Sequence, residues 1–135
     1  MAADFDTVAN LVRGWFNTKI TTVLPLSTGF DNADFTPPTS GTWCACQVRF
    51  DGRADAAIGQ PRVQGTLEAQ LYGESDQGTA DVQSKAASIA DVFDGLQIGG
   101  PPVVSFFVSE IQTVGPTGRG YWQLNVSCPF YSDEV

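Results

Sequence analysis

Three cysteines are the residues of this chain whose type and spacing could do chemistry. Cys44 and Cys46 form a C-x-C pair in "WCACQVRF", Cys128 stands near the other end, and the chain has no histidine. A zinc site needs four ligands, so three thiols without an imidazole would have to borrow a carboxylate or a second chain. Strand residues i and i+2 point the same way about 6.6 Å apart, which is poor disulfide geometry. Because free cysteine is among the most buried residue types, we expect these thiols to pack in the core.

The rest of the chain offers little for catalysis. Without histidine, a Ser-His-Asp or Cys-His arrangement is impossible within one chain. The acidic residues Asp51, Asp55, Glu74 and Asp76 fall in expected turns, without the alternating spacing and closing Glu of a calcium loop. The sequence therefore predicts no enzyme, no metal and no cofactor.

Length, charge and hydropathy narrow the class of protein further. The 135 residues fit one domain, 1–135, and carry a net charge of −8. Such an acidic surface repels phosphate backbones, so we expect no direct grip on nucleic acid. No run approaches the roughly 18 apolar residues of a membrane helix, and "MAADFDTVAN" lacks the pattern of a signal peptide. These features predict a soluble protein that folds in a cytoplasm.

Two segments have the apolar spacing of amphipathic helices. The first runs from Phe5 to Ile20, and Gly14 within it indicates a close approach of helix and sheet. The second lies in "TADVQSKAASIADVFDG", where Thr79 can cap the start and Gly95 can end the helix. In each helix one apolar stripe is available for a core.

Four segments read as strands. Alternation of period two in "WCACQVRF", "RVQGTLEAQLY" and "YWQLNVSCPFY" predicts antiparallel strands with one buried and one polar face. The fourth, residues 103–112 ("VVSFFVSEIQ"), is apolar on both faces, so it is either central or covered by something besides the two helices. Pro129 lacks an N–H and indicates that the last strand ends at, or lies near, a sheet edge.

The order of these elements, αββαββ, predicts an α+β fold: a two-layer sandwich of a four-stranded, mainly antiparallel sheet with two helices on one face. The connection "TTVLPLSTGFDNADFTPPTSG" and the segments "DGRADAAIGQP", "GESDQG" and "TVGPTGRG" are expected to be loops. The segment "DGRADAAIGQP" is longer than a hairpin connection needs to be, which is typical of a functional loop.

The polar sheet face and the loops are the candidate interaction surface, because the helices use their apolar stripes in the core. Tyrosine supplies large contact area at low entropic cost and is enriched at interfaces. The candidate interface residues are Asp51, Arg53, Asp55, Ile58, Tyr72, Glu74, Asp76, Arg119, Tyr121 and Tyr131.

Several short motifs resemble one known family over roughly the whole chain. They are "LPLSTGFDNADFTPP" before the first strand, "VQGTLEAQLYG", an alanine-rich helix ending in "VFDG", and "VSEIQTVGPTGRGYWQLNVSCPFY". The chain resembles the small tail terminator (tail completion) proteins of long-tailed bacteriophages and gene-transfer particles.

The resemblance implies a structural virion protein. Such proteins form a homo-hexameric ring on the head-proximal end of the tail tube. The tail is assembled in the host cytoplasm. They stop polymerisation of the major tail tube protein and present a surface to the neck (head–tail connector) proteins. DNA passes through the lumen without specific binding, which suits an acidic chain. No membrane and no cofactor are implied.

Two other classes of function stay open on the sequence. One is a small acidic binding module, an inhibitor of a basic partner or a DNA mimic, which would use the same negative charge. The other is an enzyme that works only as an oligomer, with carboxylates converging across subunits.

Overall fold

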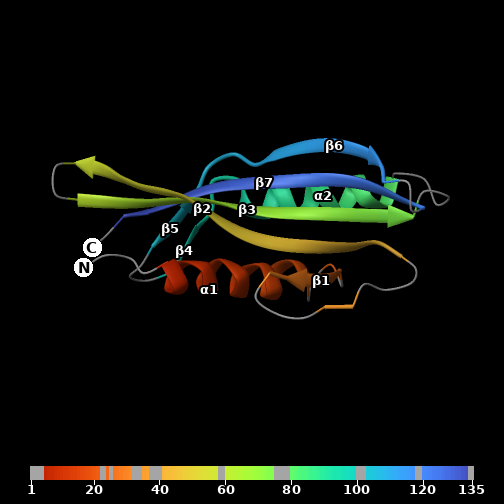
Figure 1. Cartoon of the computed structure of the whole chain (residues 1–135), viewed down its shortest axis with the longest axis horizontal. Coiled ribbons are helices and arrows are strands. Elements are labelled where there is room, and N and C mark those ends of the chain that lie inside the picture. The colour runs from red at the N-terminus through yellow and green to blue at the C-terminus, as the bar shows by residue number, and fades with distance from the viewer. Residues whose placement is uncertain are drawn as a thin grey trace.

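The computed structural model of the chain describes residues 5–21, 24, 26–31, 35–36, 41–57, 60–74, 80–99, 103–117 and 120–133, with the backbone alone for 52–57, 60–61 and 133. Two helices pack on one curled, mixed sheet (Figure 1). The strands are β1 (Ser27–Phe30), β2 (Trp43–Ala57), β3 (Gln60–Glu74), β4 (Gln97–Ile98), β5 (Val104–Phe106), β6 (Glu110–Pro116) and β7 (Tyr121–Asp133).

The helices follow the predicted apolar stripes. α1 (Phe5–Phe16) continues into a π-helical turn, η1 (Asn17–Thr21), and the stripe ends at the buried Ile20. α2 (Ala80–Phe93) ends before Gly95, which has a φ of 65°. A glycine adopts this left-handed conformation without a Cβ penalty, so the predicted end of the helix is confirmed.

The predicted four-stranded sheet is wrong, because the described residues alone form a sheet of seven strands. Their order is β1-β2-β3-β7-β5-β4, and β6 pairs with β7 outside this path. β1 runs parallel to β2, whereas all other pairs are antiparallel. The αββαββ sandwich therefore gives way to a larger curled sheet that carries both helices.

The alternation of buried and polar residues in the long strands is confirmed. The rings of Phe16 from α1 and Phe93 from α2 stack with centroids 6.0 Å apart, which places both helices on the same side of the sheet. Inward-facing residues of β2, β3 and β7 complete this core, and the fully buried ones include Cys44, Val63, Leu67, Ala69, Leu71, Val126 and Cys128.

The segment expected to be one strand, 103–112, is two strands that lie end to end along β7. Phe106 is opposite Phe130 and Glu110 is opposite Ser127, so the interruption lies beside Pro129. The N–H of Phe107 donates to the carbonyl of Pro129 at 3.0 Å, which shows that the backbone of Pro129 faces this flank. Because proline has no N–H to return, the ladder breaks here. β7 pairs with β3 on one side, and on the other side it is next to β6, beyond which no further strand is described, so the last strand does lie near a sheet edge.

Several of the expected loops contain strand residues. Residues 113–116 of "TVGPTGRG" form the end of β6. The connection after the first helix contains β1, and "DGRADAAIGQP" forms most of the end of a long hairpin, since β2 reaches Ala57 and β3 begins at Gln60. Register shifts between Phe50 and Gly52 and between Asp55 and Ala57 accommodate extra residues as bulges. Glycine and aspartate in this segment therefore mark bulges in strands rather than a loop.

Candidate interaction surfaces

The three thiols lie in the core, as predicted from their strand pattern. Burial raises the pKa of Cys44 and of Cys128 to about 11, and it raises that of Cys46 as well. Sγ of Cys44 is 3.3 Å from the hydroxyl of Thr28, and Ser109 donates to Sγ of Cys128 at 3.3 Å. Thiols that stay protonated are poor nucleophiles and poor metal ligands. Within the described residues, no group of three or more Cys, Asp or Glu is arranged to hold a metal.

A connected polar network covers the middle of the sheet face opposite the helices. Tyr72 donates to Gln70 at 3.3 Å, and Gln70 donates to Glu68 at 3.1 Å. Arg49 donates to the same carboxylate at 3.2 Å. The predicted interface residue Asp51, exposed beside Arg49, accepts a hydrogen bond from Thr66 at 3.2 Å. These side chains satisfy one another, which is the ordinary arrangement of a solvated sheet face.

Tyr72 and Tyr121 belong to an aromatic group at one end of this face. The rings of Trp43 and Tyr72 stack with centroids 4.4 Å apart, and Tyr121 meets Trp43 edge-on at 6.4 Å. Burial in this group raises the pKa of Tyr72. Glu74, half-buried, is opposite Tyr121 in the ladder.

Tyr131 lies in a second group at the other end of β7. Its ring is 5.2 Å from that of Phe107, and the guanidinium of Arg62 is 4.1 Å from its centroid. Tyr72 is opposite Gln123, so Tyr131 lies eight residues farther along β7, about 26 Å away.

Among the candidates whose side chains the structure describes, Tyr131 therefore lies apart from Tyr72, Glu74 and Tyr121. Of the remaining residues, Arg53 and Asp55 lie on the hairpin, where only their backbone is described. Ile58, Asp76 and Arg119 lie outside the described residues.

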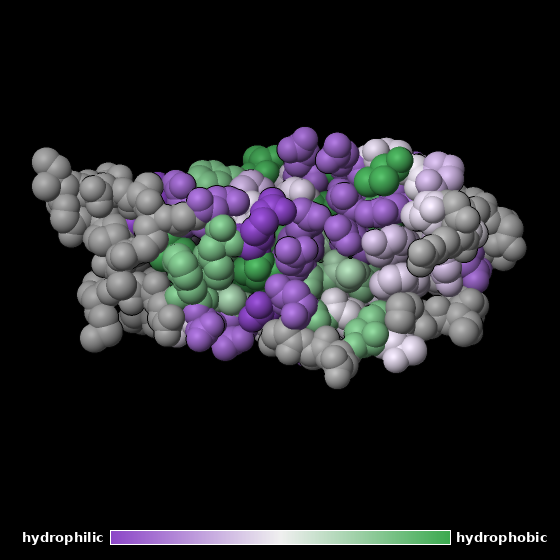
Figure 2. All heavy atoms as spheres, in the orientation of Figure 1, coloured by the Kyte–Doolittle hydropathy of each residue, from purple (hydrophilic) through white to green (hydrophobic). Residues whose placement is uncertain are grey.

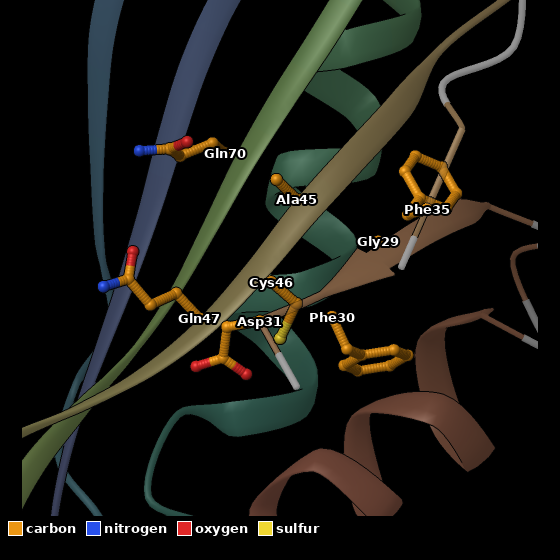
Figure 3. Close-up of a pocket in the computed structure, with 8 residues that line it drawn as sticks. All are labelled: Gly29, Phe30, Asp31, Phe35, Ala45, Cys46, Gln47 and Gln70. Carbon is orange, nitrogen blue, oxygen red and sulfur yellow. The ribbon is translucent and has the colours of Figure 1, made fainter. Parts of the chain in front are cut away.

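A groove of about 340 Å³ lies where β1 meets β2, and Figure 3 shows the side chains around it. It is lined by Gly29, Phe30, Asp31, Phe35, Ala45, Cys46, Gln47 and Gln70. One oxygen of Asp31 forms an ion pair with Arg13 at 2.8 Å, and the other accepts the backbone N–H of Val48 at 3.0 Å. This carboxylate joins α1 to the sheet, so the groove offers no unengaged acid for catalysis.

The surface that sequence reasoning missed is β6 together with the break before it. Four large apolar side chains are exposed here: Phe107 (50%), Val108 (76%), Ile111 (45%) and Val114 (52%). Figure 2 shows hydrophobic side chains beside polar ones along the border of the molecule occupied by β6 in Figure 1. The signal was present in the sequence, because residues 103–112 are apolar on both faces of a strand.

Comparisons with known proteins bear on the fold alone. No protein-family model and no curated protein matches the chain. A solved structure described only by a sequence identifier superposes with a TM-score of 0.70 at 18% identity, covering 94% of this chain and 96% of its own. Within the described residues, no helix is long and apolar enough to cross a membrane.

Proposed function

We propose that this protein is a structural subunit of a phage-type tail, a member of a ring that caps the head-proximal end of the tail tube. In this role it stops addition of the major tail tube protein and presents a surface to the neck proteins. It acts in the virion and performs no catalysis. The family part of this proposal rests on the sequence motifs "DFTPP" and "VGPTGRGYWQLNVSCPF".

The observation that carries the proposal is the exposed apolar edge of the sheet at β6. In β6, Ile111 is 45% and Val114 is 52% exposed, and Val108, in the break just before β6, is 76% exposed; β6 pairs with β7 on one side. An unpaired edge with apolar side chains is a template for another chain, and apolar exposure of this kind typically marks an interaction site. An assembly subunit needs such an edge, whereas an enzyme needs convergent reactive groups.

The charge supports the same role. A net charge of −8 on 135 residues suits a lumen wall past which DNA slides, since like charge prevents adhesion. The described acids Asp31 and Glu68 are engaged by Arg13 and Arg49 rather than gathered for chemistry.

The test is an assembly experiment with particles from the genome that encodes this chain. After deletion of the gene, electron microscopy should show over-long tails that fail to join heads, and a plasmid copy should restore both length and joining. Tails of normal length joined to heads would disprove the terminator role. Capture of a basic partner elsewhere in the cell would then favour the acidic binding module.

A further inference from the structure

The outer edge of β6 has the features of a strand edge that can pair with a further strand. In an antiparallel ladder the backbone groups of a strand point alternately to its two sides, so about half of those in β6 face away from β7. No strand among the described residues pairs with them. Glu110 and Pro116 stand at the two ends, and the stretch between them carries no charge. Protective charges and prolines usually blunt such an edge, and its middle has neither.

A second incomplete element lies at the far end of the sheet. We call it the arm: β2 from Gly52 to Ala57 and β3 from Gln60 to Pro61. The described part of β7 ends with Asp133 opposite Arg62, and beyond that point the two strands of the hairpin have no other partner strand among the described residues. Figure 1 shows the arm projecting past the rest of the sheet. A two-stranded ribbon alone is marginally stable in water, and a third strand stabilises it.

The arm of a molecule points away from its own β6. Glu110, the nearest end of β6, is opposite Ser127, and the arm begins past Asp133. Along β7, six residues separate Ser127 from Asp133, a distance of about 20 Å. From Asp133 the arm extends farther away from β6 (Figure 1). A pairing between these two elements must therefore join two copies of the chain.

We propose that the arm of one copy adds as a strand to the β6 edge of the next copy, in a repeated head-to-tail contact. This inference rests on the proposed function and specifies its self-interface, since a head-to-tail contact closes into a ring when its rotation allows. It supplies the missing third strand of the arm and covers Ile111 and Val114.

Charge favours this pairing over other contacts between two acidic copies. The arm holds one arginine, Arg53, and one aspartate, Asp55, whereas the whole chain carries −8. β6 holds one charge, Glu110. The two segments together carry a net charge of only −1 (one arginine, one aspartate and Glu110), so they add little to the repulsion between copies.

The experiment uses purified full-length chain and two variants that each remove one half of the contact. The arm-shortened variant replaces residues 55–61 by Asn-Gly, a two-residue turn between Ala54 and Arg62, which are opposite each other in the native ladder. The edge-charged variant is Ile111→Lys with Val114→Lys. Its matched control, Gln83→Lys with Ala87→Lys, adds the same charge to the exposed side of α2.

Sedimentation of millimolar protein measures self-association at low salt and at about 1 M salt, where the Debye length falls to about 3 Å. The native chain and the α2 control should associate, more strongly at high salt because repulsion is screened. Each of the other two variants should raise the dissociation constant at least about thirtyfold. Circular dichroism of both variants establishes that they are folded.

Mixing the two defective variants gives the decisive result. The arm-shortened chain retains its edge and the edge-charged chain retains its arm, so an equimolar mixture should form heterodimers and nothing larger. Association of the arm-shortened variant alone, as strong as native, would mean that β6 pairs with β6 and would overturn the inference. A native chain that stays monomeric at high salt would overturn it too. Because purified chain is measured, failure here is distinct from failure of the tail-length experiment.

Discussion

The two flanks of β7 are built differently. On one flank, β3 pairs with β7 over thirteen successive residues, Arg62 to Glu74, without a register shift. On the other flank, β5 and β6 each pair with part of β7. The ladder is interrupted beside Pro129, and its register shifts between Thr113 and Gly115. Inward-facing residues of β3 such as Leu67 are fully buried, whereas most of β6 is exposed.

The difference shows that one strand can have a flank that stabilises the fold and a flank that leaves apolar side chains accessible. Large apolar side chains occur on both flanks. Val63, Leu67 and Leu71 of β3 are fully buried and stabilise the fold, whereas Ile111 and Val114 of β6 stay accessible. A continuous ladder holds side chains in register with the helices, and an interrupted one turns some of them outward. The flanks should therefore respond very differently to substitution.

The largest expected effect is that of Phe130→Ala, at the inward face of β7. Its ring is 1% exposed and contacts those of Phe50 and Phe106, at 6.0 and 5.6 Å between centroids. The cavity left should lower the free energy of unfolding by about 3–5 kcal/mol in urea denaturation. The matched substitution Phe107→Ala, on the broken flank, should cost at most about 1 kcal/mol. Equal losses would erase the distinction between the flanks.

Gly65→Ala tests the closeness of packing between β3 and its neighbours. An added Cβ would lie 2.6 Å from the carbonyl oxygen of Arg49 and 2.6 Å from Cζ of Phe130. Because the backbone cannot yield, we expect a loss of about 1–3 kcal/mol in the same measurement.

Gly14→Ala is the control for that substitution. Nothing lies within 4 Å of a Cβ at Gly14, so the close helix-to-sheet approach expected there from the sequence is wrong. Alanine should stabilise α1 by up to about 1 kcal/mol. A destabilised Gly14→Ala chain would indicate that the helix sits closer to the sheet than the structure has it.

The buried thiols should make the stability of the protein depend on pH in the alkaline range. Burial raises the pKa of Cys44 and Cys128 from 9.0 to about 11, so the unfolded chain loses these protons first as the pH rises. The stabilising contribution is present below pH 9.0 and is lost by about pH 11. Urea midpoints measured across this range should fall less in a Cys44→Ala, Cys128→Ala chain than in the native one. Parallel titration curves would show that other groups dominate.

The smallest expected effect is that of Ile111→Thr in β6. The residue is 45% exposed, and threonine keeps the branched Cβ that strands favour, so the monomer should change by no more than about 0.5 kcal/mol. Self-association should nevertheless weaken in sedimentation. A large loss of monomer stability would mean that β6 belongs to the core.

The sequence by itself determined the features that repeat over a few residues. Alternation identified the inward faces of β2, β3 and β7, including Cys44, Cys46 and Cys128, and spacing at three and four identified α1 and α2. It also put Tyr72, Tyr121 and Tyr131 on the polar face. These assignments succeed because burial of one face depends on the period of the local backbone, which the side chains report directly.

Only the tertiary structure decided which strands are neighbours, and with that the strand count and the interaction surfaces. β1 has four residues without alternation, and it is a strand because β2 supplies its hydrogen bonds. The split between β5 and β6 comes from Pro129, a residue about twenty positions away in sequence that removes one N–H from the ladder. The distance between Tyr72 and Tyr131 follows from the register of β3 against β7. Hydrogen-bond partners far apart in the chain set all three, and no local pattern encodes them.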